Sequence, residues 1–294
     1  MKLIAPIYQL NHMEKLSKHL DGFLIGNDHF GTRLTHSFEI AEINQAIEQS
    51  KILHKEIFLV CNQIFTDDQL IELSDFISKI HTKDLQGIIL GDLGALSMLK
   101  SRGFQDQLIY NPETLLTNVY DVNFLHQQKV QGVYLAKEIT LEDIIYIAQQ
   151  KKLKLFMVGH GHLNMFYSKR QLIDNFTKYI EIDNDFHDAQ NIKIIEETRK
   201  DEAYPIIEDR AGTHVFRSKV MASLNQLETL EKWIDYLVID SIFKDDAYTE
   251  KVSSWYQKKS VDPKDLEVLK HDYQELWDEG FFFKKTIYKQ KVRS

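Results

Sequence analysis

Two histidines, His160 and His162, follow an apolar run at residues 153–158 and are well suited to acid–base chemistry. The run predicts a short buried strand, and Gly159 and Gly161 predict a sharp turn at its end. Histidine changes its charge near neutral pH, so an imidazole at a strand end can act as a general acid or base. We therefore predict His160 as a catalytic residue.

The spacing of the two histidines also occurs in metal sites, because residues two apart lie on one side of an extended chain. A third ligand would have to come from a distant residue such as His187, His214 or Asp92, and nothing in the sequence fixes it. We therefore predict no metal site. Histidines that hydrogen-bond within the protein or contact a substrate are the preferred interpretation.

Polar side chains also follow the other predicted strands. If the strands form a barrel, their carboxyl ends share one mouth and these side chains meet there. Arg33 or Lys137 would then bind an anion, and Glu138 and Asp92 are further candidate catalytic acid–base groups. The alternative for each residue is a helix cap or a loop hydrogen bond. The predicted mouth residues are Arg33, Asn62, Asp92, Asn111, Lys137, Glu138, His160 and Asp240.

An aromatic and basic segment at residues 166–170 follows the histidines. Its side chains and those at the mouth form the set that we expect to contact a substrate. The predicted substrate-binding residues are Arg33, Asn62, Asn111, Lys137, Tyr167, Arg170 and His214.

Short apolar runs rich in β-branched residues alternate with helical patterns along the chain. Each predicted strand is followed by a helix, which is typical of parallel βαβ units, and eight such units predict a (β/α)8 TIM barrel of the α/β class. An open doubly wound sheet is the alternative, although the chain contains neither GxGxxG nor GxxxxGK[ST]. The predicted strands span residues 3–7, 22–26, 56–62, 87–92, 107–110, 132–136, 153–158 and 236–239.

The regular alternation stops after the seventh strand. We predict a barrel domain at residues 1–245 with an irregular polar excursion at 163–212, followed by a C-terminal helix and tail at 246–294. Thr66 and Thr140 are predicted to cap the helices that follow them, and Ser37 to cap the helix after the second strand.

The 294 residues carry a net charge of -8, which argues against general binding of polyanions. The charge is uneven, because the segment from Phe281 onward has five basic residues and no acid. This tail is either a solvated end or a contact for RNA phosphates. The single cysteine, Cys61, excludes a disulfide within the chain, and no apolar run reaches the ~20 residues that cross a bilayer. We expect no membrane contact and a cytoplasmic protein.

Several stretches resemble, in the same order, the collagenase-like peptidase family, the U-32 class of bacterial and archaeal proteins. The resemblance covers about residues 1–245, and Gly280 and Phe281 are similar to the family's C-terminal end. The stretches lie at residues 3–6, 21–33, 38–42, 60–70, 135–142, 160–168 and 201–219. The resemblance implies a barrel-like fold. It also implies one of two activities: proteolysis, or hydroxylation of a tRNA wobble uridine, of ribosomal RNA or of ubiquinone precursors.

The hydroxylating members of that family hold an iron–sulfur cluster on four cysteines. In this chain, Asn164, Gln171 and Ala222 occupy positions where the resemblance implies cysteines, and Phe156 replaces the family's glutamate. These side chains cannot replace thiolates on a cluster, so we predict no cofactor on this chain.

Members of this family can work in pairs. The preferred hypothesis is a subunit without a cluster that forms a heterodimer with a cysteine-bearing paralogue in tRNA uridine hydroxylation, with the basic tail in contact with tRNA. Alternatives are a collagenase-like peptidase, for which no metal motif or nucleophile elbow is present, and a non-catalytic barrel that binds a small metabolite. Whether this chain alone is an enzyme stays open.

Overall fold

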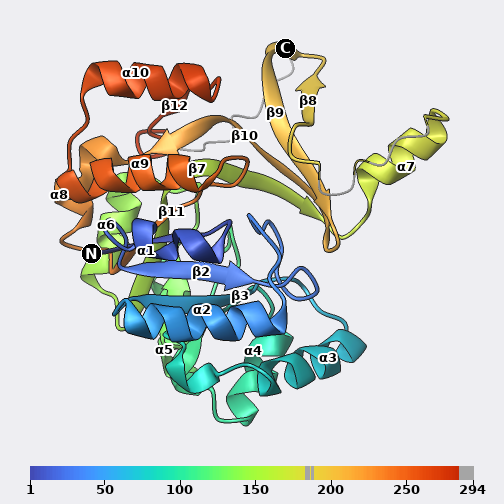
Figure 1. Ribbon diagram of the computed structural model, residues 1–294, viewed down its shortest axis with the longest axis vertical. Coiled ribbons are helices and arrows are strands. Elements are labelled where there is room, and N and C mark those ends of the chain that lie inside the picture. The colour runs from blue at the N-terminus through green and yellow to red at the C-terminus, as the bar shows by residue number, and fades with distance from the viewer. Residues whose placement is uncertain (183–185, 187–188, 285–294) are drawn as a thin grey trace, which may run out of the picture.

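The computed structural model describes residues 1–182, 186 and 189–284, which form a closed barrel of eight parallel strands surrounded by helices (Figure 1). β11 pairs with both β1 and β7, and this pairing closes the ring. The predicted (β/α)8 barrel is confirmed, and the open sheet was the wrong alternative. The barrel strands are β1 Lys2–Pro6, β2 Gly22–Gly26, β3 Glu56–Cys61, β4 Gly87–Leu90, β5 Leu108–Tyr110, β6 Gly132–Tyr134, β7 Lys154–Ser168 and β11 Tyr236–Ile239.

Helices on the outside of the barrel connect its strands. Thr66 and Thr140 form capping boxes at the starts of α3 and α6, as predicted. The prediction for Ser37 was wrong: Glu39 caps α2, while the Ser37 hydroxyl accepts a 2.9 Å hydrogen bond from the Asp28 N–H. These helices are α1 Met13–Leu16, α2 Ile40–Ile52, α3 Asp67–Ser78, α4 Leu93–Ser101, α5 Val119–Gln127, α6 Leu141–Gln149 and α8 Leu227–Leu230, with 3-10 turns at Leu10–His12, Thr82–Asp84, Gln105–Gln107 and Leu224–Gln226.

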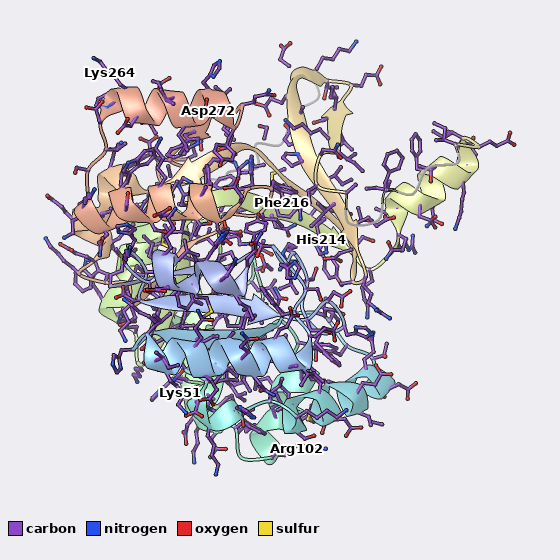
Figure 2. The ribbon with its side chains drawn as sticks, viewed as in Figure 1. Lys51, Arg102, His214, Phe216, Lys264 and Asp272 are labelled. Atoms are coloured by element: carbon purple, nitrogen blue, oxygen red, sulfur yellow. The ribbon has the colours of Figure 1, made fainter. Side chains whose placement is uncertain are left out.

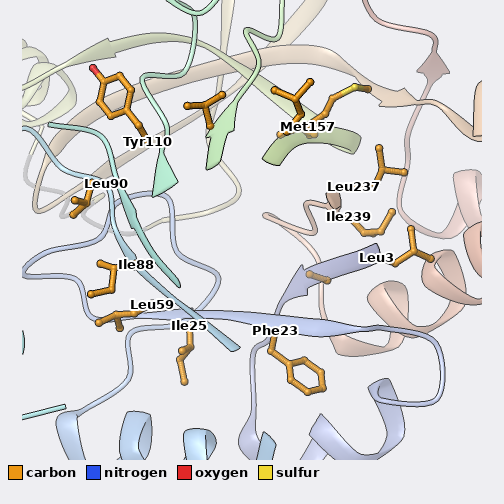
Figure 3. Packing of buried hydrophobic residues seen from close by; sticks show 14 of the residues in the cluster. Leu3, Phe23, Ile25, Leu59, Ile88, Leu90, Tyr110, Met157, Leu237 and Ile239 are labelled. Atoms are coloured by element: carbon orange, nitrogen blue, oxygen red, sulfur yellow. The ribbon is translucent and has the colours of Figure 1, made fainter. Parts of the chain in front are cut away.

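Side chains of the barrel strands alternate between two apolar layers, as the two-residue period of a strand requires. On β7, Phe156 belongs to the layer inside the barrel, whereas Met157 belongs to the layer between strands and helices. Figure 3 shows part of that outer layer, including Phe23 and Leu237. An open cavity lies at the mouth of the barrel, above the inner layer.

The segment after the seventh barrel strand is more regular than predicted. β7 continues past the barrel to Ser168 and pairs there with β10 (Gly212–Ala222). β9 (Arg199–Asp209) pairs with β10, and β8 (Lys193–Glu196) pairs with β9. α7 (Leu172–Tyr179) projects from this sheet away from the barrel (Figure 1). Within residues 163–212, strands and α7 together make up most of the described part, where the sequence predicted irregular structure.

Gly159 and Gly161 lie within β7 and do not make a turn, so that prediction was wrong. They allow β11 to approach β7 closely. A Cβ atom on Gly159 would lie 2.4 Å from Leu237 side-chain atoms, and one on Gly161 would lie 2.4 Å from the Asp240 carbonyl oxygen. Gly161 also has φ of +130°, which L side chains rarely adopt.

The C-terminal part contains α9 (Asp246–Lys258) and α10 (Pro263–Asp272), where the sequence predicted a single helix. A short strand, β12 (Trp277–Asp278), pairs with β10 and ties this part to the excursion. Most of the basic tail, residues 285–294, lies outside the described residues. None of the helices in the described ranges is long and apolar enough to cross a membrane.

Candidate functional site

A cavity of about 80 Å³ opens at the carboxyl ends of the barrel strands, where barrel proteins place their active sites. Its floor is apolar and its rim is polar, so it can hold a small ligand by a few directed contacts. The polar lining residues include Thr32, Arg33, Asn62, Asn111, Glu113, Lys137 and Asp240, together with Thr35, His36 and Tyr134. Of the predicted mouth residues, the structure thus brings together Arg33, Asn62, Asn111, Lys137 and Asp240.

The barrel interior below the cavity is filled by a stack of aromatic rings. The Phe156 ring lies parallel to Tyr236, with centroids 4.3 Å apart and 5° between the planes, and stacks on Tyr134 at 5.1 Å. Phe58 meets Phe156 edge-on at 5.7 Å. Phe156, which stands where the resemblance implies a glutamate, is therefore a packing residue.

Two cations share one carboxylate at the mouth. Arg33 Nη2 lies 2.6 Å from Glu113 Oε1, and Lys137 Nζ contacts the other carboxylate oxygen, Oε2. The Arg33 and Lys137 side chains are only 9% and 8% exposed. Burial would raise the pKa of Glu113, but Arg33 and Lys137 outweigh it and lower the pKa to about 2. With one anion for two cations, this group carries a net positive charge.

The loops that carry this group have backbone conformations that are uncommon for side-chain-bearing residues. Arg33 has φ of +57° and Glu113 has φ of +65°. Hydrogen bonds hold both loops: Asn62 Oδ1 accepts from the Thr32 N–H at 2.9 Å, and Asn111 Oδ1 accepts from the Glu113 N–H at 3.2 Å. Strained residues of this kind persist where the surroundings fix them, and they concentrate at functional sites.

Asp240 lies at the end of β11 and lines the same cavity. Burial raises the pKa of its carboxyl group, against the opposing effect of Lys137. Its Oδ1 accepts a 3.1 Å hydrogen bond from the Ile242 N–H. The cavity thus combines two cations with a carboxyl group that resists ionisation, an arrangement that favours an anionic ligand.

Replacing Glu113 with glutamine should destabilise the protein, because Arg33 and Lys137 would then be buried cations without a counter-ion. We expect the free energy of unfolding to fall by about 3–5 kcal/mol in urea titrations at pH 7. Inorganic phosphate should restore part of the loss, by occupying the place of the carboxylate. The matched control is E72Q on the exposed face of α3, which should change little. An E113Q protein as stable as the wild type would contradict the assigned charge balance.

The excursion reaches the mouth through β9 and β10. His214 on β10 (Figure 2) lies beside Arg33, with 3.3 Å between Nδ1 and Arg33 Nη1, and the Tyr167 ring stacks on the imidazole at 4.7 Å. Asp209 accepts a 2.9 Å hydrogen bond from the Arg33 N–H. Arg170 is exposed beyond the end of β7 and is not among the residues that line the cavity. His214 and Asp209 therefore contact Arg33, and Tyr167 contacts His214, whereas Arg170 lies apart from the cavity.

Asp92 and Glu138 do not line the cavity, so their predicted placement at the shared opening was wrong. Asp92 Oδ1 accepts a 2.8 Å hydrogen bond from the Ala95 N–H and caps α4, which was the alternative interpretation. Glu138 is half-buried in the turn after β6.

His160 was also wrongly placed at the opening. Its ring is fully buried on the outside of the barrel, where Nε2 lies 2.8 Å from the Tyr248 hydroxyl and Nδ1 lies 3.3 Å from the Tyr256 hydroxyl. Burial lowers the pKa of His160 to about 3, so the ring is neutral. His160 is therefore a structural residue that hydrogen-bonds within the protein, as the alternative interpretation had it.

His162 lies on the same side of β7 as His160 and contacts the C-terminal part of the chain. Its Nε2 is 3.2 Å from Glu275 Oε1, and Glu275 also accepts hydrogen bonds from Tyr248, Trp277 and Lys244. Within the described ranges, no three His, Cys, Asp or Glu side chains form a group that could hold a metal ion. His187, a suggested third ligand, lies outside those ranges.

Glu113 and Asp209 were missed by the sequence analysis, although they make the shortest contacts to Arg33. Glu113 follows Asn111-Pro112 directly after β5, so its place after a strand end could have identified it. Asp209 lies at a hairpin of the excursion, and only the return of that hairpin over the barrel brings it to the mouth. No local pattern predicts this.

The residues present do not fit an iron–sulfur cluster. The one cysteine, Cys61, is fully buried in the layer between barrel and helices, where burial raises the pKa of its thiol. Asn164 and Gln171 donate hydrogen bonds to backbone carbonyl groups, at 3.1 Å to Phe166 and 3.0 Å to Asp209. Four thiolates are needed, and this chain can supply one at most.

Known proteins share both the sequence pattern and the fold. The family description "Peptidase family U32" matches residues 11–285. The tRNA hydroxylation protein P2 of Bacillus subtilis (strain 168) is 27% identical over 97% of this chain and 98% of its own length. The tRNA hydroxylation protein P1 of the same strain is 23% identical over 59% of this chain and 42% of its own length.

Among solved structures, the U32 peptidase Mk0906 has a TM-score of 0.51 at 11% identity, covering 82% of this chain and 92% of that one. At this identity the likeness concerns the fold, and it agrees with the closed barrel described above. The family match spans nearly the whole chain and includes the barrel strands from β2 onward, the polar residues at the mouth and the excursion. The chain belongs to peptidase family U32.

Proposed function

We propose that this chain is a subunit without an iron–sulfur cluster that works with a cysteine-bearing relative in tRNA uridine hydroxylation. The supporting observation is its similarity, along almost its whole length, to a tRNA hydroxylation protein, combined with a single buried cysteine. Two related tRNA hydroxylation proteins occur in one bacterial strain, which is consistent with a pair. We place the assembly in the cytoplasm, where its tRNA substrate is found.

We further propose that the mouth cavity binds a small anionic ligand in this assembly. Arg33 and Lys137 supply the positive charge, and Asn62 and Asn111 hold the loops on which Arg33 and Glu113 lie. The proposal is supported by the burial of both cations around a single carboxylate. It leaves Asp92, Glu138 and His160 without a catalytic role.

The decisive experiment combines purification with genetics. The tagged chain is co-expressed with a cysteine-bearing U32 relative from the same genome, and the two are expected to co-elute in size-exclusion chromatography. Deletion of the gene should abolish hydroxylation of the wobble uridine, as measured by mass spectrometry of tRNA nucleosides. Separate elution of the two proteins, together with unchanged tRNA modification in the deletion strain, would reject the proposal.

We propose that the basic tail contributes to tRNA binding. Its part beyond Lys284 lies outside the described residues and contains four basic side chains. Removing residues 285–294 should weaken binding of the assembly to tRNA and reduce the slope of log affinity against log salt by about 3. Fluorescence anisotropy at several salt concentrations measures this slope. A variant with the three tail lysines changed to arginine keeps the charge and should keep the slope, and a truncated chain with the wild-type slope would contradict the tail's role.

The cavity also favours a second candidate, a non-catalytic barrel that holds a small metabolite. Native mass spectrometry of freshly purified protein distinguishes the two functions, because a retained metabolite appears as added mass. This candidate requires a retained ligand and normal tRNA modification in the deletion strain.

A further inference from the structure

Asp209 on β9, His214 on β10 and Thr32 in the loop after β2 form a hydrogen-bonded chain that ends at Arg33. Asp209 Oδ2 accepts from the Thr32 hydroxyl at 2.6 Å and from the Arg33 N–H at 2.9 Å. His214 Nε2 lies 2.8 Å from the Thr32 hydroxyl oxygen and 3.3 Å from Asp209 Oδ1. The other ring nitrogen, Nδ1, faces Arg33 Nη1 at 3.3 Å. One imidazole therefore lies between a carboxylate and a guanidinium.

The guanidinium determines which nitrogen of His214 carries the proton. Arginine only donates hydrogen bonds, so Nδ1 must accept from Arg33 and the proton must be on Nε2. The Nε2–H then donates toward Thr32 and Asp209, while the Thr32 hydroxyl donates to Asp209. The carboxylate thus fixes the tautomer that presents a lone pair to Arg33, as orienting carboxylates do for histidines at other sites.

The surroundings hold the imidazole in this place. His214 is 0% exposed, and the Tyr167 ring covers it with 3° between the planes. The Tyr167 hydroxyl donates to the Ala211 carbonyl at 3.0 Å, so this ring is itself fixed. Burial lowers the pKa of His214, and a neutral ring is the form that can accept from Arg33.

The backbone of Arg33 explains why such support is needed. Its φ of +57° turns the residue out of the conformations preferred by side-chain-bearing residues. The guanidinium must also be held against the cavity, because arginine side chains lose considerable rotamer freedom when fixed. Glu113 contacts Nη2 and His214 contacts Nη1, so the two ends of the fork have different partners from different parts of the chain.

We propose that Asp209 and His214 are positioning residues that hold the Arg33 guanidinium at the mouth cavity, ready for an anionic ligand. This inference rests on the anionic-ligand role of the cavity in the proposed function and adds its means of orientation. In this view the β9–β10 hairpin folds back over the barrel so that Asp209 and His214 reach Arg33. The excursion then supplies part of the ligand site rather than a separate unit.

The test uses two amide variants that each replace one half of the imidazole. In H214N the amide oxygen can take the place of Nδ1 and accept from Arg33, whereas in H214Q the amide nitrogen takes the place of Nε2 and leaves Arg33 Nη1 without its acceptor. Nitrogen-15 spectra of the arginine side chains report whether the guanidinium rotates freely. Resolved Nη signals of Arg33, assigned by their loss in R33K, are expected in the wild type and H214N. Averaged signals are expected in H214Q and in D209A.

Phosphate affinity provides a second readout, measured by calorimetry with inorganic phosphate at low salt. H214Q should weaken binding about tenfold, as loss of a hydrogen bond to a charged group typically does, and H214N should stay within about twofold of the wild type. Wild-type Arg33 signals in H214Q or in D209A would overturn the proposal. Equal phosphate affinity of the wild type and H214Q would also overturn it.

The wild-type protein alone gives a further check if the variants do not fold. Long-range nitrogen-15 correlation spectra identify the tautomer of His214, and a proton on Nδ1 would overturn the inference. These readouts need neither RNA nor a partner protein. Failure of the tRNA experiments would therefore reject the proposed function and leave the positioning of Arg33 to be decided by the spectra.

Discussion

Replacing Phe156 with alanine should lower the free energy of unfolding by about 3–5 kcal/mol. The Phe156 ring is fully buried and lies between Tyr134 and Tyr236 in the centre of the barrel, with Phe58 against its edge. Alanine would leave a cavity that strands on every side prevent from collapsing. Urea unfolding followed by circular dichroism measures the loss.

The control for this prediction is F124A on α5, where the side chain is 56% exposed. F124A should lower the free energy of unfolding by well under half as much as F156A does, because surface substitutions usually change it by at most about 0.5 kcal/mol. F156E, which introduces the glutamate that the family resemblance implies in other members, should lower the free energy of unfolding more than F156A does. A carboxylate at this site would be buried among mainly aromatic neighbours. Equal stability of F156A and F124A would contradict the aromatic stack as the centre of the core.

The second large effect is expected at Glu275, which joins the C-terminal part of the chain to β7. Its carboxylate accepts from His162, Tyr248, Trp277 and Lys244, and its side chain is 4% exposed. E275Q would leave Lys244 as a buried cation without a counter-ion, at a cost of about 3–5 kcal/mol. Thermal and urea unfolding at pH 7 measure the difference from the wild type.

The pH dependence of this difference gives a sharper check. Burial would raise the pKa of Glu275, but His162 and Lys244 outweigh it and lower the pKa to about 2. A lowered pKa means that ionised Glu275 stabilises the fold above its ordinary pKa of 4.5, and that this contribution disappears as the pH falls toward 2.

The wild type and E275Q should therefore approach each other in stability between pH 4.5 and pH 2. The control is E267Q on α10, whose side chain is 71% exposed and pairs with Lys270 at the surface. That variant should cost at most about 1 kcal/mol at pH 7. A difference between wild type and E275Q that stays constant down to pH 2 would contradict the assigned network.

The barrel could be predicted because its signals are local. Each of the eight runs has its own apolar pattern and its own following helix, and residues 22–26 and 236–239 were predicted with the bounds that the structure shows. The caps at Thr66 and Thr140 were predictable for the same reason, since a capping box spans only four residues. Closure of the ring then follows from the strand number.

The excursion could not be predicted in this way, because its order comes from pairing between distant strands. β7 continues past Gly161 only because β10, about 60 residues later, pairs with it at Gly161↔Met221 and His162↔Val220. Glycines that suggest a turn were needed instead for the close approach of β11. Local propensity was overridden by tertiary pairing.

The candidate site was predictable in part. Asn62 and Asn111 follow barrel strands directly, and Arg33 and Lys137 lie in the loops after β2 and β6, so the barrel brings all four to one cavity. His160 also lies on a barrel strand, but its side chain points to the outside of the barrel. There it contacts Tyr248 and Tyr256 of α9 instead of lining the mouth. Residues supplied by the hairpin, such as Asp209, required the three-dimensional arrangement.

The pairing of β11 with β1 has a consequence for biosynthesis. Lys2 lies opposite Tyr236, so the first strand waits for a partner made more than two hundred residues later. Contacts of such long range close slowly, and a nascent chain that lacks β11 leaves the hydrogen-bonding edges of β1 and β7 open. Ribosomes that stall before Tyr236 should therefore release aggregation-prone polypeptides, and translation past this strand marks the moment at which the ring can first complete itself.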